Sequence, residues 1–160
     1  MFIVGLPRSR TAWLSVFMSQ SKTYFHHEAI NGCYSLDEYN QKILNCGDST
    51  TGFTLLNDIL KDKKVVIIKK NEKELKKCIE WCNKEFGESK EVILEMNAAL
   101  NNIKGLVINQ SEIDGELKNI WEFLVDDKWC DEYSNIVKFN IQVKSTAIDE
   151  IAAKALYETI

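Results

Sequence analysis

Four consecutive β-branched apolar residues, Val65-Val66-Ile67-Ile68, constrain the fold more than any other feature of the sequence. Successive side chains of a strand point to opposite faces, so a strand without a polar position is buried on both faces. Lysines stand on both sides of this run and mark where the chain leaves the core. Such strands are typical of parallel sheets covered by helices on both faces, so the sequence predicts an α/β fold.

Other strand and helix patterns alternate along the chain and extend this prediction. Short β-rich runs indicate strands over residues 2–5, 23–26, 52–54, 65–68, 106–108 and 136–143. Helices are expected over residues 10–20, 36–44, 55–60, 72–86, 90–102, 113–125 and 147–157. Residues 45–51 are polar and are expected to form a turn. The alternation predicts right-handed crossovers and a three-layer sandwich with a central, mostly parallel sheet.

The apolar positions of four helices predict how each helix packs. The helix over residues 10–20 is apolar nearly all round and should be buried on several sides. The helix over 72–86 has an apolar stripe made of Leu75, Cys78, Ile79, Cys82 and Phe86. The helix over 90–102 should turn inward Val92, Ile93, Met96, Ala99 and Leu100. The helix over 113–125 should bury Ile113, Leu117, Ile120, Trp121 and Leu124.

Length and composition exclude several classes of protein. The chain has 160 residues, 45% hydrophobic and 28% charged, as expected for one folded domain with a sizeable core. Lys and Arg total 20 against 24 Asp and Glu, and the net charge of −4 argues against binding of nucleic-acid polymers. Apolar runs fall short of the roughly 20 residues that a membrane span needs. Arg8 and Arg10 interrupt the apolar start, which argues against a secretory leader.

The five cysteines do not form a recognisable framework. They are odd in number and scattered, with Cys78 and Cys82 one helical turn apart; the others are Cys33, Cys46 and Cys130. None of their spacings matches a zinc-finger pattern, and an odd number does not suit a disulfide scaffold. We therefore expect reduced thiols in a cytoplasmic protein, without structural zinc.

The turn after the first strand carries the chemistry. Ligands of open parallel sheets bind beyond the carboxyl ends of the strands, where this turn should lie. The N–H groups at the start of the following helix attract phosphate or sulfate. Arg8 and Arg10 add guanidinium groups suited to oxyanions, and Ser9 and Thr11 add hydroxyl donors. Alternatively, Ser9 only caps the helix and the arginines are solvated, but four such residues around one helix start make this the weaker interpretation.

The turn does not match an ordinary P-loop, which reads GxxxxGK followed by Ser or Thr. Counting from Gly5, Arg10 replaces the second glycine, Thr11 replaces the lysine and Ala12 replaces the Mg²⁺-binding hydroxyl residue. ATP or GTP hydrolysis is therefore disfavoured, and a P-loop kinase relative is the least favoured of the alternatives.

The segment Pro7-Arg8-Ser9-Arg10-Thr11-Ala12-Trp13-Leu14 resembles the PKSGTTWL loop of sulfotransferases, whose carbohydrate-acting members often have PRSGT. In that family the loop binds the 5′-phosphosulfate of 3′-phosphoadenosine 5′-phosphosulfate (PAPS). The resemblance implies a P-loop NTPase-like fold and no metal. It implies that Arg8 stabilises the leaving phosphate and that Ser9 and Thr11 bind the 5′-phosphate. The cofactor-binding segment then comprises Pro7, Arg8, Ser9, Arg10, Thr11, Ala12 and Trp13.

Two positions of this loop depart from the family pattern. Arg10 stands where the family has glycine, so we expect a loop without the tightest glycine conformation. Ala12 stands where the family has threonine, which removes one hydroxyl contact.

A second family signature is a strand ending in Arg, then Asn-Pro, then a helix with a serine eight positions after the Arg. Lys70-Asn71-Glu72 follows the strand over 65–68 in this way, and Cys78 lies eight residues after Lys70. The resemblance implies that Lys70 and Cys78 hold the 3′-phosphate of PAPS. Cysteine is a poor hydrogen-bond donor, and Cys78 also lies on the apolar stripe of its own helix. Lys70 could equally be a solvated charge at a strand end.

The base that deprotonates the acceptor is expected at His26-His27-Glu28. Heparan-type sulfotransferases have a Glu near the end of the second strand, which makes Glu28 the first candidate and His27 the second. Strand alternation points His26 away from His27. Equally, Glu28 and His27 could be a polar pair at a strand end. The polar segment over 47–52 could close over the acceptor.

The resemblance covers residues 2–81 and leads to three readings. The first is a small, phage-type sulfotransferase of one domain over residues 1–160, moving a sulfuryl group from PAPS to a hydroxyl or amine of a small molecule or glycan. The second is a non-catalytic nucleotide- or oxyanion-binding module, and the third is a P-loop kinase relative. Neither the acceptor nor the oligomeric state follows from the sequence.

Overall fold

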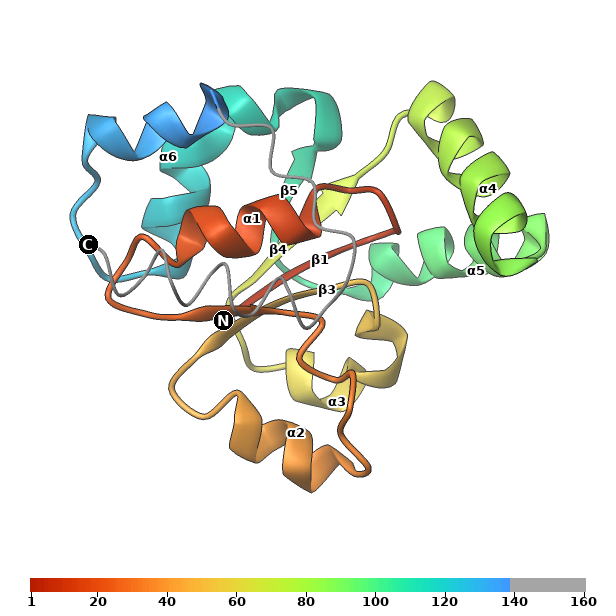
Figure 1. The fold of residues 1–160 in the computed structure, drawn as a ribbon, viewed down its shortest axis with the longest axis horizontal. Coiled ribbons are helices and arrows are strands. Elements are labelled where there is room, and N and C mark those ends of the chain that lie inside the picture. Colours follow the sequence, from red (N-terminus) through yellow and green to blue (C-terminus); the bar gives the residue numbers. More distant parts are fainter. Residues whose placement is uncertain (139–160) are drawn as a thin grey trace.

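A five-stranded parallel sheet forms the centre of the computed structural model, which describes residues 1–138 (Figure 1). Its strands are β1 (Phe2–Gly5), β2 (Phe25–His27), β3 (Gly47–Thr50), β4 (Val65–Lys69) and β5 (Leu106–Asn109). They lie in the order β2-β3-β1-β4-β5, and every pairing is parallel. The sequence prediction of an α/β fold is confirmed. Strand β1 occupies the middle of the sheet, and β4, which contains the apolar run Val65–Ile68, lies next to it.

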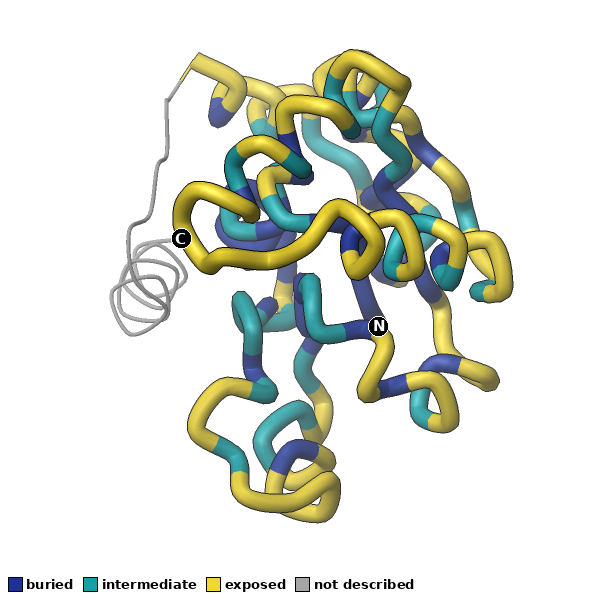
Figure 2. Tube along the Cα trace, turned by 90° about the vertical axis from the view of Figure 1, so that its right-hand side faces the viewer, coloured by how far each residue is buried: buried dark blue, intermediate teal, exposed yellow. Residues whose placement is uncertain are grey.

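Helices cover both faces of this sheet. One face carries α1 (Thr11–Met18) and α6 (Ile113–Leu124), which pack against Ile3, Val66 and Ile68. The other face carries α2 (Leu36–Lys42), α3 (Asn57–Leu60), α4 (Glu72–Phe86) and α5 (Lys90–Ala99), which pack against Phe2, Val65 and Ile67. Short 3-10 helices span Phe53–Leu55, Leu100–Asn102, Gln110–Glu112 and Asp131–Lys138. The described residues therefore form three layers, and burial is concentrated along the central strands (Figure 2).

The apolar patterns of α1 and α6 predicted their packing correctly. Every residue of α1 except Ala12 is buried, because the helix packs on the sheet in one layer with α6. All five residues expected on the inner stripe of α6 are buried. Two inward positions predicted for the other face are wrong: Phe86 is 66% exposed and Val92 is 40% exposed. Phe86 is the last residue of α4, and its ring packs edge-on against Trp81 instead of entering the core.

The prediction of a turn over residues 45–51 is wrong, because residues Gly47–Thr50 form β3. Asp48, Ser49 and Thr50 are all fully buried, and their side chains are satisfied by hydrogen bonds within the protein. A Cβ at Gly47 would collide with the ring of Phe25 on β2, so only glycine fits there. These residues lie inside the sheet, so they do not form a segment that closes over an acceptor.

The strand expected over residues 52–54 is also wrong, because Phe53–Leu55 is a 3-10 helix with the Phe53 ring buried. The start of the strand expected over 136–143 is wrong as well, because Asp131–Lys138 is a 3-10 helix. The remainder of that strand and the helix expected over 147–157 lie outside the described residues. Within residues 1–138 no helix has the length and apolar character needed to cross a membrane.

Candidate oxyanion site at the carboxyl edge of the sheet

The loop between β1 and α1 lies where a parallel sheet most readily forms a binding crevice. From β1 the chain passes to the face of the sheet that carries α1, whereas from β3 and β4 it passes to the opposite face. Connections that diverge in this way leave a crevice beyond the carboxyl ends of the strands. We call residues 5–11, which join β1 to α1, the open corner.

Close contact between Gly5 and Ser9 shapes the open corner. A Cβ on Gly5 would lie 2.9 Å from the Ser9 Cβ and 3.2 Å from the Ile68 Cβ, so a larger residue would displace the loop. The Ser9 N–H donates to the Leu6 carbonyl over 3.1 Å, which tightens the turn. Ser9 is fully buried, and its hydroxyl finds no hydrogen-bond partner among the described residues. A buried hydroxyl normally has a hydrogen-bond partner. The Ser9 hydroxyl has none among the described residues, which indicates a place where a ligand would supply the acceptor.

Arg8 and Arg10 both adopt left-handed backbone conformations, with φ of 65° and 62°. The expectation that Arg10 needs a loop without the glycine conformation is therefore wrong, because its φ is one that glycine adopts most easily. Such a conformation costs a non-glycine residue about 1 kcal/mol or more. Arg10 thus holds a backbone conformation that glycine adopts at lower cost.

The start of α1 has no cap of its own. Arg10 stands at the N-cap position, no side chain bonds the first N–H groups, and the first turn has no acidic residue. The starts of α2, α4 and α5 are capped by Ser35, Asn71 and Ser89, and α3 and α6 have acidic residues in the first turn. Among the α-helices within residues 1–138, only α1 has neither device. Its N–H groups and partial positive charge are therefore left for another acceptor.

The two arginine side chains of the open corner have different surroundings. Arg8 is exposed and lies over the ring of Trp81, with its Cζ atom 5.4 Å from the ring centroid. No carboxylate within residues 1–138 pairs with Arg8. Arg10 instead lies over Trp13 at 4.2 Å and forms an ion pair of 2.7 Å with Asp114. Arg8 is therefore the guanidinium that is ready for a bound anion.

The other loop residues predicted to bind the cofactor hold the corner in place. The Pro7 carbonyl accepts a hydrogen bond from Cys78, and the Thr11 carbonyl accepts one from the Ser49 hydroxyl over 2.8 Å. Trp13 is buried and stacks on Phe17, so its role is in the core as well as beneath Arg10. Ala12 presents its carbonyl to the Ser15 hydroxyl.

Lys70 and Cys78, the two residues of the second signature, lie beside the open corner. The Lys70 ammonium donates to the Arg8 carbonyl over 3.0 Å and to the Gln110 side chain. The Cys78 thiol donates to the Pro7 carbonyl over 3.2 Å. Burial lowers the pKa of Lys70 and raises the pKa of Cys78. Both side chains brace the loop backbone, and their role toward a 3′-phosphate stays a prediction.

His27 and Glu28 reach the same edge from the end of β2. The Glu28 carboxylate accepts hydrogen bonds from the Thr50 hydroxyl at 2.7 Å and from the Thr51 N–H at 2.6 Å. The His27 Nε2 atom lies 3.4 Å from the Thr11 hydroxyl and 3.8 Å from a Glu28 oxygen. Both side chains are mostly buried, at 14% and 11% exposed. The structure thus brings the candidate bases next to the open corner through Thr11.

A buried carboxylate that the sequence interpretation missed supports this edge. Asp48 on β3 accepts hydrogen bonds from the Ala29 N–H at 3.1 Å and from the Tyr39 hydroxyl at 2.8 Å. Burial raises the pKa of Asp48 to about 6, and burial next to Asp48 also raises the pKa of Tyr39. Because Ala29 follows Glu28, Asp48 fixes the loop that carries the candidate bases. The polar composition of residues 45–51 predicts a turn, so it gives no sign that Asp48 is buried.

Three further residues of this edge left no local signal in the sequence. Trp81 of α4, Gln110 after β5 and Asp114 of α6 contact Arg8, Lys70 and Arg10, respectively. Each contact joins residues far apart in the chain, so it depends on how α4 and α6 pack.

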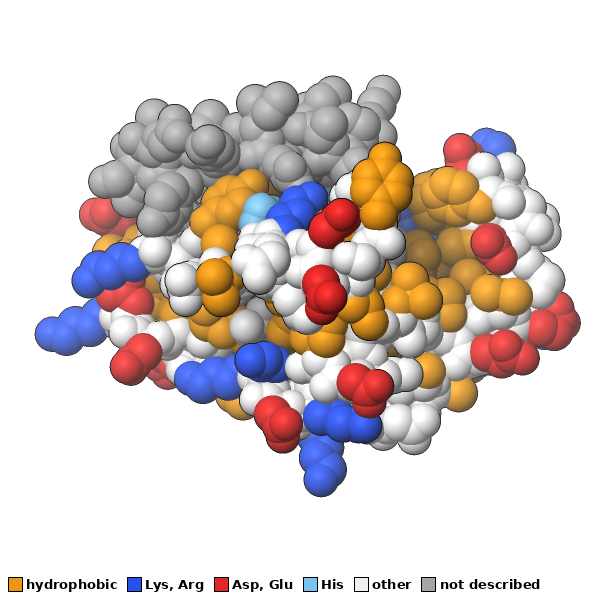
Figure 3. Space-filling model, turned by 90° about the horizontal axis from the view of Figure 1, so that it is seen from below, with side chains coloured by type: hydrophobic (Ala, Val, Ile, Leu, Met, Phe, Trp, Pro, Cys, Tyr) orange, Lys and Arg blue, Asp and Glu red, His pale blue; other side chains and the backbone are white. Residues whose placement is uncertain are grey.

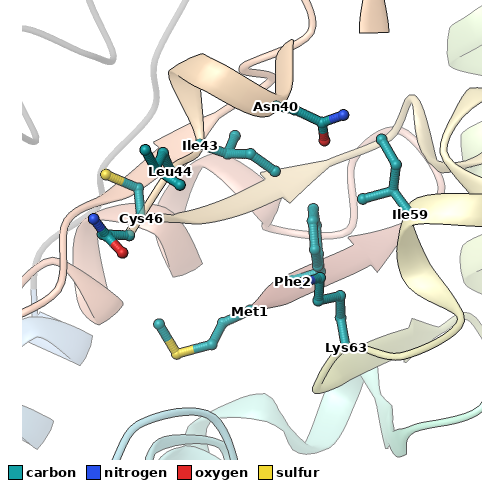
Figure 4. A pocket seen from close by; sticks show the side chains of 9 residues that line it. Met1, Phe2, Asn40, Ile43, Leu44, Cys46, Ile59 and Lys63 are labelled. Carbon is teal, nitrogen blue, oxygen red and sulfur yellow. The ribbon is translucent and has the colours of Figure 1, made fainter. Parts of the chain in front are cut away.

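A separate cavity of about 520 Å³ lies at the opposite, amino-terminal edge of the sheet (Figure 4). Phe2, Ile43, Leu44 and Ile59 give it apolar walls, and Lys63 stands at its side.

Basic and acidic side chains both occur on the face seen in Figure 3. Within residues 1–138 no group of three or more His, Cys, Asp or Glu side chains is placed to hold a metal ion.

Comparison with protein-family models, curated proteins and solved structures gives no match for this chain.

Proposed function

We propose that the open corner binds the phosphate groups of PAPS and that the chain is a sulfotransferase with a P-loop NTPase-like fold. The observation that carries this proposal is the uncapped start of α1 beside Arg8, which has no carboxylate partner within the described residues. N–H groups at a helix start and an available guanidinium are the donors that a phosphate or phosphosulfate requires.

The residues at this edge fit such a ligand. The Ser9 hydroxyl has no acceptor among the described residues and can donate to a bound anion. The first turn of α1 has no carboxylate that would repel an anion. Arg8 would bind the leaving phosphate, Ser9 to Thr11 would hold its oxygens, and Lys70 would add positive charge near a 3′-phosphate. When bound, PAPS supplies an activated sulfuryl group for transfer to a hydroxyl or amine.

The acceptor proton would go to His27 or Glu28. Both Glu28 oxygens already accept hydrogen bonds from the end of β3, whereas the His27 Nε2 atom faces Thr11 of the corner. A general base must contact the acceptor directly or through one water. His27 and Glu28 lie next to each other beside Thr11, so each of them is a candidate for this role. We propose a small molecule or glycan as acceptor.

Calorimetry with 3′,5′-adenosine bisphosphate, 5′-AMP and ATP with Mg²⁺ tests the ligand. We expect the bisphosphate to bind tightest and Arg8→Ala to weaken it about 30-fold or more, as expected when a charged hydrogen-bonding partner is lost. Lys73→Ala is the matched control, because Lys73 is an exposed cation in the first turn of α4. A preference for ATP with Mg²⁺, or equal losses in both variants, would overturn the proposal.

The second candidate function is a non-catalytic module that binds the nucleotide without turnover. It is favoured because both oxygens of the Glu28 carboxylate already accept hydrogen bonds within the protein. Transfer of labelled sulfate from PAPS to a panel of hydroxyl and amine acceptors separates the two. Loss of transfer in Glu28→Gln or in His27→Asn, with bisphosphate binding retained, identifies an enzyme and the residue that acts as its base. Binding without transfer to any acceptor of the panel identifies the non-catalytic module.

A further inference from the structure

Arg10 is the residue of the open corner that has a partner, and that partner is Asp114 in the first turn of α6. The Arg10 Nη1 and Asp114 Oδ1 atoms are 2.7 Å apart. The contact joins the loop after β1 to the helix after β5. It places the negative charge of Asp114 directly on one of the two arginines of the open corner.

The pair is exposed and therefore easily broken. The Arg10 and Asp114 side chains are 29% and 54% exposed, and ion pairs in such surroundings contribute little to stability. Asp114 accepts no other side-chain hydrogen bond within the described residues, so water can replace Arg10 at little cost. An anion that binds the corner competes with Asp114 for the same guanidinium.

Trp13 keeps Arg10 beside the corner when the ion pair opens. The guanidinium lies over the indole ring, 4.2 Å from its centroid, and Trp13 is itself fixed in the core by stacking on Phe17. The left-handed backbone of Arg10 is set by the turn and does not depend on Asp114. Release of Asp114 therefore leaves a positioned cation near the start of α1.

We propose that Asp114 acts as a counter-ion latch, a residue that holds Arg10 in the free protein, limits the affinity of the corner for anions and yields Arg10 to a highly charged anion. This inference rests on the proposed anion site of the open corner. Asp114 repels every anion at the corner, but only a ligand with several negative charges gains enough from Arg10 to displace it. The latch thus lowers affinity for every anion, and most of all for a nucleotide with two phosphate groups, which must displace Asp114 to reach Arg10.

The sign of the effect separates a latch from a structural tie. If Asp114 is a latch, Asp114→Asn raises affinity for anions, because a competing negative charge is lost. If the ion pair instead holds the loop in its binding shape, the same change lowers affinity. Glu116→Gln is the matched control, because Glu116 lies in the same first turn of α6 and bonds Asn119, not Arg10.

Titration calorimetry at fixed ionic strength should compare these variants with 3′,5′-adenosine bisphosphate and 5′-AMP. We expect Asp114→Asn to raise bisphosphate affinity about fivefold and 5′-AMP affinity about twofold, with a change below about twofold for Glu116→Gln. In an Arg10→Gln background the Asp114→Asn gain should fall to the level of the control.

Lower affinity in Asp114→Asn, an equal gain in Glu116→Gln, or an undiminished gain in the Arg10→Gln background would overturn the latch. If the wild type prefers the bisphosphate but Asp114→Asn gains nothing, the latch fails and the proposed function stands. If the two nucleotides bind the wild type equally, the PAPS proposal fails and the latch is still read from the gains in Asp114→Asn. Absence of binding by both proteins overturns both.

Discussion

Two loops at the carboxyl edge of the sheet differ in how they satisfy the free N–H groups at the start of the helix that follows. The open corner leads from β1 into α1, and residues 69–72, which we call the closed corner, lead from neighbouring β4 into α4. At the closed corner, Asn71 bonds the Glu74 N–H and Glu74 bonds back to the Asn71 N–H, each over 2.9 Å. The open corner has no such cap and carries two arginines. One helix start is satisfied within the chain, and the other is left for a ligand.

The difference shows where the chain gives up stability for binding. The closed corner uses ordinary extended backbone at Asn71, whereas the open corner holds Arg8 and Arg10 in left-handed conformations. A helix cap contributes about 1 kcal/mol, and each left-handed residue costs a similar amount. The open corner is kept in shape by neighbours: Lys70 and Cys78 hold its carbonyls from one side, and Ser49 holds it from the other.

The largest expected effect concerns the buried Asp48 carboxylate, which bonds the Ala29 N–H next to Glu28. The folded-state pKa of Asp48 is raised from 3.8 to about 6, so the folded protein binds this proton more tightly than the unfolded chain. Its contribution is complete below about pH 4 and is lost as the pH rises through about 6, by about 3 kcal/mol. Asp48→Asn removes this loss. Urea unfolding should therefore show the variant gaining about 3 kcal/mol on the wild type between pH 4 and pH 7.

Asp58→Asn is the control for this prediction, because Asp58 is exposed and Lys61 holds its pKa below the ordinary value. Stability from a lowered pKa is present above about pH 4, so this variant should not gain on the wild type as the pH rises. A constant difference between Asp48→Asn and the wild type across this range would contradict the buried charge.

The outcome at Asp48 also shows what could be predicted from the sequence. Apolar runs identified β1 and β4, because a strand without a polar position is buried on both faces. β3 was missed because Asp48, Ser49 and Thr50 are buried with hydrogen-bond partners from other elements, and local composition carries no trace of those partners. The packing of α6 was predicted because its stripe is long and regular, whereas the end of α4 departs from its stripe at the rim of the sheet.

Some features of the candidate site could be predicted from the sequence, and others depend on tertiary packing. The open corner, Lys70 and the candidate bases were expected at one edge, because the ends of parallel strands meet there. The contacts of Trp81 and Asp114 with the arginines were not expected, because their positions follow from helix packing. Local sequence thus predicted which groups meet, and tertiary packing decides which arginine is left without a counter-ion.

The second prediction enlarges Gly5 beneath the open corner. In Gly5→Ala the new Cβ would lie 2.9 Å from the Ser9 Cβ, and both atoms belong to or adjoin backbone that cannot swing away. Such overpacking costs about 2 kcal/mol and displaces the loop, so bisphosphate affinity should fall at least about tenfold. Gly115→Ala in α6 is the control: its Cβ meets no atom within 4 Å, and it should stabilise the protein by about 0.5–1 kcal/mol. Unchanged affinity in Gly5→Ala would place the ligand elsewhere.

The third prediction removes the cap of the closed corner. Asn71→Ala should lower the free energy of unfolding by about 1 kcal/mol, because it leaves N–H groups at the start of α4 without a partner. Ser89→Ala at α5 should cost a similar amount. Bisphosphate affinity should stay within about twofold of the wild type in both, since neither cap touches the open corner. A large loss of affinity in Asn71→Ala alone would show that the two corners bind together.

The smallest expected effect tests the contact through which the closed corner serves the open one. Trp81 lies on α4, and its ring holds the Arg8 guanidinium from one side. An exposed contact of this kind contributes about 0.5–1 kcal/mol, so Trp81→Leu should weaken bisphosphate binding by roughly two- to fivefold. Phe86→Leu is the matched control, because Phe86 packs edge-on against Trp81 without touching Arg8. Equal losses in both calorimetric titrations would mean that α4 merely supports the fold. A loss confined to Trp81→Leu would mean that a helix with a satisfied start orients the cation of its unsatisfied neighbour.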